Sequence, residues 1–95
     1  MRITEEERRK LEKSLAAFLQ KNVANRIRAL REITFLGFEK FSLELGFSRN
    51  ITINWENGSK IPSMESIGRL IHEYIEFIFY NEEVYRKAKE LLEGY

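Results

Sequence analysis

One segment near the middle of the chain constrains the fold most, because it carries its own start and stop signals for a helix. It runs from Phe47 to Gly58 and reads FSRNITINWENG. Ser48 can cap a helix by accepting a hydrogen bond from a free backbone N–H, and Gly58 can adopt the left-handed conformation that ends helices. The segment therefore predicts a short helix over residues 48–57.

The predicted helix has a packing face and a polar face. At the spacing of a helical turn, Ile51 and Trp55 lie together on the packing face. The opposite face gathers one cation, three amides and one isoleucine: Arg49, Asn50, Ile53, Asn54 and Asn57. An ordinary solvated face and a surface that reads a partner both fit this pattern, so the flanking segments decide between them.

Apolar spacing and capping residues predict more helices on either side. Thr4 and Glu7 have the spacing of a capping box, which starts a helix near residue 5. The pair Lys21–Asn22 is a plausible break, so two helices over 5–20 and 23–34, or one kinked helix, fit the pattern. Later helices are predicted over residues 38–45, 63–80 and 81–95. The chain is therefore expected to be all-α.

The composition fits one soluble domain and offers few routes to catalysis. A chain of 95 residues with 43% hydrophobic and 33% charged residues can form one small core. It has no cysteine and a single histidine, His72, so no metal site, cofactor or enzymatic activity is expected. The sequence has no signal peptide and no apolar run long enough to cross a bilayer, which predicts a cytoplasmic protein without a membrane partner.

Charge is distributed unevenly along the chain, although the net charge is only +1. Residues 21–63 carry seven Lys or Arg against four Glu, whereas residues 64–95 carry four against seven. The basic middle is therefore expected to face phosphate, and the acidic C-terminal third to face away from it.

Three motifs lie in register between residues 25 and 75. They are RIRALR at residues 26–31, LGFSR at residues 45–49 and WENGSKIPS at residues 55–63. Gly46, in the second motif, falls in a tight turn between two predicted helices, which is the arrangement of a helix-turn-helix. On these motifs the chain resembles the phage-repressor and Cro-type helix-turn-helix family, also called the xenobiotic-response-element family.

The resemblance implies a fold and a division of the chain. It implies an all-α, compact domain of five to six helices of the phage-repressor-like type, with an extra N-terminal helix. Residues 1–95 are expected to form this single domain. Its parts are an N-terminal helical extension at 1–22, the helix-turn-helix core at 23–75, and a C-terminal helix at 76–95 that is available for dimerisation.

The resemblance also implies a structural ion pair between Arg31 and Glu56, so Glu56 is not expected to act as a catalytic acid. The chain departs from the family pattern at two positions. Phe38 stands where the family places a glutamine that clamps phosphate, and Thr52 stands where it buries an aliphatic residue. One phosphate contact is therefore not expected here. For Thr52 two alternatives are open: the helix is rotated slightly, or Ile53 sits exposed as an apolar base contact.

The polar face of the helix over 48–57 is expected to supply base contacts in the major groove of DNA. Arg49 suits guanine through a bidentate fork, Asn50 and Asn54 suit adenine or each other, and Ile53 suits a thymine methyl. Phosphates of the DNA backbone are expected to be contacted by four residues: Ser48, Asn57, Lys60 and Arg26.

A homodimer is expected, because one recognition helix reads few base pairs and such proteins pair over two half-sites. The predicted interface collects apolar residues near the C-terminus: Phe77, Ile78, Phe79, Tyr80, Val84, Tyr85, Leu91 and Leu92. The alternative is that the N-terminal helix covers these residues within a single copy.

The leading hypothesis is a sequence-specific, double-stranded DNA-binding transcriptional regulator, in particular a repressor of phage, plasmid or host genes. Its rival is a helix-turn-helix domain that binds a protein, such as an antitoxin, an anti-restriction factor or a nuclease inhibitor. The low net charge, Phe38 and the apolar run at 51–53 leave this rival open.

Overall fold

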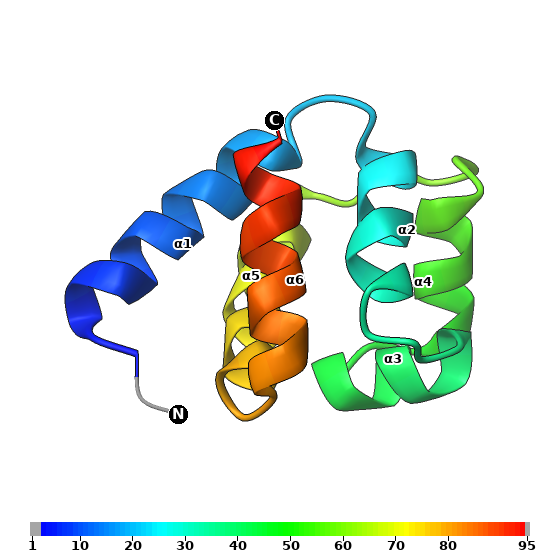
Figure 1. Ribbon diagram of the computed structural model, residues 1–95. Coiled ribbons are helices and arrows are strands. Elements are labelled where there is room, and N and C mark those ends of the chain that lie inside the picture. Colours follow the sequence, from blue (N-terminus) through cyan, green and yellow to red (C-terminus); the bar gives the residue numbers. More distant parts are fainter. Residues whose placement is uncertain (1–2, 95) are drawn as a thin grey trace.

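A computed structural model describes residues 3–94, and within them the chain forms six helices and no strand (Figure 1). The helices are α1 (Glu5–Phe18), α2 (Val23–Glu32), α3 (Phe38–Leu45), α4 (Arg49–Glu56), α5 (Met64–Phe79) and α6 (Glu82–Glu93). The prediction of an all-α chain is therefore confirmed, as are the positions of all the predicted helices to within a few residues.

The break between the first two helices is real. Asn22 adopts the left-handed conformation, with φ at 51°, so the chain changes direction before α2 begins. At the other end of α1, the Thr4 hydroxyl accepts from the Glu7 N–H at 3.1 Å, and the Glu7 carboxylate accepts from the Thr4 N–H at 3.4 Å. This is the capping box that the sequence predicts. The left-handed Asn22 makes α1 and α2 two separate helices rather than one kinked helix.

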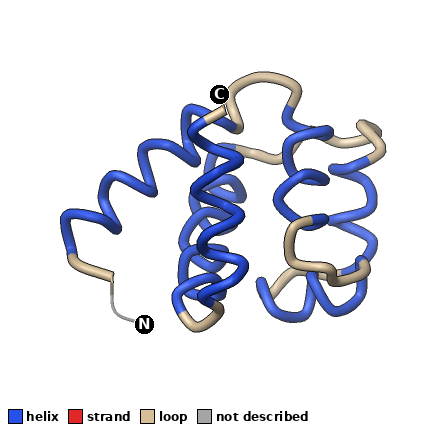
Figure 2. Tube along the Cα trace, viewed as in Figure 1, coloured by secondary structure: helices blue, strands red, loops and turns tan. Residues whose placement is uncertain are grey.

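Helix α5 connects the two sides of the molecule. In Figures 1 and 2, helices α1, α5 and α6 lie on one side and α2, α3 and α4 on the other, and α5 packs against α1, α3 and α6. Its inward face is fully apolar except for Tyr74, whose buried hydroxyl donates to the Leu30 carbonyl at 2.7 Å. This burial raises the pKa of Tyr74, because the charged phenolate has no water around it.

Helix α1 belongs to the same hydrophobic core as the other helices. Leu11, Leu15 and Phe18 point inward from it and join the buried side chains of α5. The segment that the sequence separates as an N-terminal extension therefore shares its packing with the helices that follow it.

Two residues of the predicted dimer interface are buried within one copy. Ile78 and Val84 lie in the hydrophobic core, because the chain turns back after α5 and packs α6 against it. The prediction that these two side chains meet a second copy is wrong. Among the eight residues proposed for the interface, only Tyr80 is exposed, at 84%, and its ring contacts that of Phe79.

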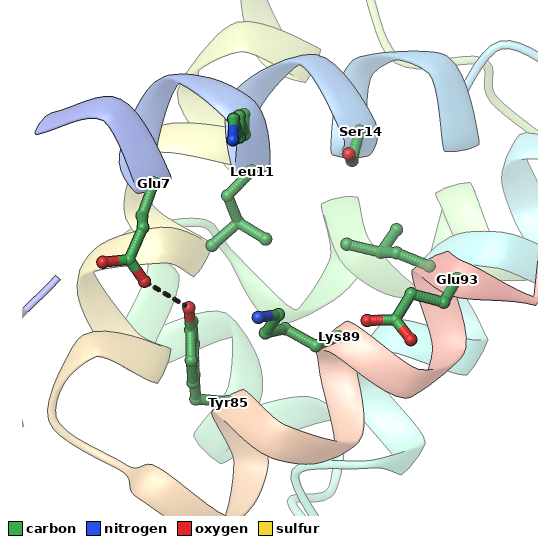
Figure 3. Close-up of a pocket in the computed structure, with 8 residues that line it drawn as sticks. Glu7, Leu11, Ser14, Tyr85, Lys89 and Glu93 are labelled. Carbon is green, nitrogen blue, oxygen red and sulfur yellow. Dashed lines mark hydrogen bonds between the residues drawn. The ribbon is translucent and has the colours of Figure 1, made fainter. Parts of the chain in front are cut away.

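Other members of that set are half-buried and face α1 across a groove. Tyr85 and Leu92 line a groove of about 290 Å³ between α1 and α6, together with Leu11 (Figure 3). The Tyr85 hydroxyl donates to the Glu7 carboxylate across this groove at 3.4 Å. The N-terminal helix therefore covers part of the surface that the sequence assigns to dimerisation, as the alternative hypothesis expects.

Within residues 3–94, no helix is both long enough and apolar enough to cross a membrane.

Candidate nucleic-acid interface

The turn between α3 and α4 fixes where α4 begins. Gly46 ends α3 in the left-handed conformation, with φ at 73°, and the next N–H, on Phe47, returns to the Ser42 carbonyl at 2.9 Å. Ser48 then caps α4, because its hydroxyl accepts from the Ile51 N–H at 3.2 Å. The three-residue turn thus places α4 at a defined angle to α3.

An arginine from α5 holds this turn in place. The Arg69 guanidinium donates to the Gly46 carbonyl and stacks over the Phe47 ring, with 4.5 Å from its central carbon to the ring centroid. The Phe47 ring in turn meets the Trp55 ring edge-on at 4.9 Å. Arg69 carries no local signal in the sequence, because it lies more than twenty residues from the turn and meets it only in the folded chain.

A buried carboxylate fixes the far end of α4. Glu56 is 2% exposed, and Arg31 donates to both of its carboxylate oxygens, at 2.8 and 3.1 Å. Arg28 approaches from the same face of α2, at 3.6 Å from the carboxylate, and donates to the Glu56 backbone carbonyl at 3.2 Å. The structure thus brings together the two residues of the expected ion pair and adds Arg28. The three-residue spacing of Arg28 and Arg31 could have indicated this second arginine.

Phe38 has a structural role next to the Arg31–Glu56 ion pair. The Arg31 guanidinium lies over its ring, 4.3 Å from the centroid. The ring therefore covers the ion pair from one side, and a planar cation on an aromatic face is a favourable contact.

Thr52 is fully buried, and its hydroxyl has hydrogen-bond partners. It lies 2.5 Å from the Ser42 hydroxyl, which in turn lies 2.6 Å from the Phe38 carbonyl. The Arg49 carbonyl is a second acceptor for Thr52, at 3.0 Å. A polar residue is therefore tolerated at this core position of α4, because α3 offers a hydroxyl opposite it.

We expect Thr52→Val to lower the free energy of unfolding by about 1 kcal/mol, because it removes one buried hydrogen bond at nearly constant volume. Ser42→Ala should cost a similar amount. The double variant should lose less than the sum of the two, because the hydroxyls lie in contact. Urea denaturation of all four proteins checks this. If the loss in the double variant equals the sum of the two single losses to within about 0.3 kcal/mol, the pairing of Ser42 with Thr52 is contradicted.

The exposed face of α4 carries most of the predicted base contacts. Arg49 and Asn50 are exposed in its first turn, while Ile53 and Asn54 are half-buried further along. Ile51, which the sequence assigns to the packing face, is 43% exposed, because α4 packs through Thr52 and Trp55 instead. This orientation of α4 brings Ile51, in addition to Ile53, toward the outer surface.

Two asparagines of this face are tied to the loop that follows α4. The Asn57 side-chain oxygen accepts from the Ser59 N–H at 2.9 Å. The Ser59 hydroxyl donates to the side-chain oxygen of Asn54 at 3.1 Å. Both carboxamides are therefore oriented by Ser59, which the sequence does not single out.

A groove of about 480 Å³ runs beside α4 and is positively charged. Its polar lining comes from Asn50, Asn54, Lys60, Arg69 and the first turn of α5, and its apolar lining includes Ile51 and Ile61. None of the described residues that line it is acidic. A second groove, of about 330 Å³ at the end of α5, is lined instead by Glu44, Glu73 and Glu76. The two grooves therefore carry opposite charge, although Arg69 belongs to the acidic C-terminal third of the chain and Glu44 to its basic middle.

Arg26 lies apart from this face. Its guanidinium donates to the Phe18 carbonyl at 2.7 Å and lies 5.0 Å from the centroid of the Phe18 ring, at the end of α1. The structure therefore places three of the four predicted phosphate contacts, Ser48, Asn57 and Lys60, on or next to α4. It turns Arg26 toward α1 instead, because Arg26 and Arg28 point to opposite sides of α2.

Similarity to known proteins adds no constraint on this face. Comparison of the chain with protein-family models, with curated proteins and with solved structures finds no match. The geometry and chemistry of α4 and its surroundings therefore carry the functional conclusion.

Proposed function

We propose that the protein is a sequence-specific, double-stranded DNA-binding transcriptional regulator, in particular a repressor, that inserts α4 into the major groove. The observation that carries the proposal is the combination of a short helix fixed at both ends and a polar outer face. Arg69 fixes the turn before α4, and Arg31 fixes its far end. A rigid helix of this size fits the major groove, where base edges can be read directly.

The charges around α4 favour an anionic partner. Three cations lie on or beside this face: Arg49, Lys60 and Arg69. None of the described residues that line the adjoining groove is acidic. Phosphate contacts position a protein on DNA, and they make binding fall with increasing salt. Such a regulator acts in the cytoplasm of a bacterial cell, which agrees with the cytoplasmic location expected from the sequence.

Arg49→Ala should relax sequence preference, because it removes a donor pair aimed at base edges and costs about 1 to 3 kcal/mol of discrimination. Lys60→Ala should weaken binding to all sequences alike and reduce the slope of log affinity against log salt by about one. Titration of an enriched duplex and a scrambled duplex at several salt concentrations measures both effects. Equal weakening of both duplexes by Arg49→Ala would remove it as a base contact.

Binding to a protein is the second candidate function, and one observation favours it. Ile61, in the loop after α4, and Met64, at the start of α5, are 83% and 91% exposed, and the exposed Ile51 lines the same groove as Ile61. Exposed apolar side chains near one another are typical of protein-binding surfaces. An antitoxin, an anti-restriction factor or a nuclease inhibitor would use this face in that way.

Selection from genomic DNA fragments separates the two candidates. A homodimeric regulator should enrich one inverted repeat, with half-sites about one DNA turn apart. Of the residues predicted for the interface, the exposed Tyr80 and the half-buried Phe77, Phe79 and Leu91 remain for pairing two copies. Enrichment of no motif would reject the regulator and favour the protein-binding function.

A further inference from the structure

The loop after α4 restricts how Asn54, on the outer face of α4, can form hydrogen bonds. Asn54 is half-buried in this face, and its side-chain oxygen accepts from the Ser59 hydroxyl at 3.1 Å. Ser59 is itself held, because its N–H donates to the Asn57 side-chain oxygen at 2.9 Å. The next N–H, on Lys60, closes the turn on the Asn54 carbonyl at 3.2 Å.

This arrangement turns the oxygen of the Asn54 carboxamide toward the loop and its NH₂ group away from it. A carboxamide makes the two-hydrogen-bond pair with adenine only when its oxygen and its NH₂ group face the base edge side by side, because adenine offers one acceptor and one donor. Guanine and thymine instead offer carbonyl oxygens in the major groove, and these need only a donor.

We infer that Ser59 makes Asn54 a hydrogen-bond donor alone, so that α4 reads a keto base, guanine or thymine, at the position facing Asn54. This inference rests on the proposed binding of α4 to DNA. It departs from the simple pairing of asparagine with adenine. It also gives Ser59, which faces no base itself, the role of a positioning residue that sets specificity.

Asn50 provides an internal comparison on the same helix. It is exposed, and no side-chain hydrogen bond restrains its carboxamide within the part of the chain that the structure describes. Both ends of its carboxamide are therefore free to pair with adenine. The two asparagines should differ in the base they accept, although their side chains are chemically identical.

The experiment is selection from a randomised duplex library by the intact protein and by Asn54→Ala, Asn50→Ala and Ser59→Ala. The position whose preference disappears in Asn54→Ala is the one that Asn54 reads. In the wild type this position should hold guanine or thymine, with adenine depleted about fivefold or more. In Ser59→Ala the carboxamide is free to turn, so adenine should be accepted there, while the position read by Asn50 keeps its preference. Thermal unfolding is the control for the fold. A melting midpoint of Ser59→Ala near that of the wild type would show that the exposed loop substitution leaves the fold intact.

Three results would overturn the inference while the protein still binds DNA specifically. These are adenine selected at the Asn54 position by the wild type, an unchanged preference at that position in Ser59→Ala, or no position that depends on Asn54. A merely structural role for Ser59 would lower affinity for all sequences and leave the base preference as it was. A library that yields no motif with any of the proteins rejects the proposed DNA-binding function itself, and the inference falls with it.

Discussion

Replacing Glu56 with glutamine should lower the free energy of unfolding by about 3 to 5 kcal/mol, the largest effect we expect from any single polar substitution in this chain. The Glu56 carboxylate is 2% exposed and accepts two hydrogen bonds from Arg31. Glutamine keeps the shape of the side chain but removes its charge. The Arg31 guanidinium, itself largely buried, would then remain charged without a counterion.

Thermal and urea denaturation followed by circular dichroism measure this effect. In a domain of this size the melting midpoint should fall by more than about 10 °C. A matched control is Glu90→Gln, which breaks an ion pair of similar length, 2.7 Å to Arg86, on the exposed face of α6. The control should leave the midpoint nearly unchanged, because exposed ion pairs contribute little. Equal, small losses in both variants would show that the Arg31–Glu56 pair does not support α4.

Leu15→Ala should lower the free energy of unfolding by about 2 to 5 kcal/mol, because it leaves a cavity between α1 and α5. Leu15 is 0% exposed, although it belongs to the helix that the sequence separates as an extension. The free energy of unfolding from urea denaturation checks this value.

Lys13→Ala is the control for that measurement, since Lys13 is exposed on the same helix and alanine preserves helix propensity. It should change stability little. If Leu15→Ala cost no more than Lys13→Ala, α1 would be an appendage that folds against the domain without stabilising it. If the cost is as large as expected, α1 is part of the cooperative core.

The helices could be predicted from the sequence because their signals are local. Thr4, Ser48 and Ser63 cap the helices that follow them, each through a hydrogen bond to a backbone N–H three residues on. Gly46 ends α3 in the left-handed conformation that favours glycine. Each of these contacts joins residues close in sequence, so the pattern of residue types is enough to place the helix ends.

The surfaces could not be predicted in the same way, because burial depends on how helices pack. Ile78 and Val84 look like exposed apolar residues until α6 is placed against α5, where both become core. Ile51 looks like a packing residue until the Ser42–Thr52 contact sets the rotation of α4. Helical periodicity gives the relative angles of side chains but not which angle faces the core.

The sequence by itself determined the approximate limits of the helices, the cap of α4 and the cation and amides on its outer face. It could do so because helix capping and helical spacing act over a few residues. Only the tertiary structure decided that Arg28 and Arg69 help to hold α4 in place and how its asparagines are oriented. Arg69 reaches the turn from another helix, and Arg28 meets Glu56 beside Arg31, the partner that the family resemblance already implies. The contacts of Arg28 and Arg69 join residues more than twenty positions apart, so no local pattern encodes which arginine will make them.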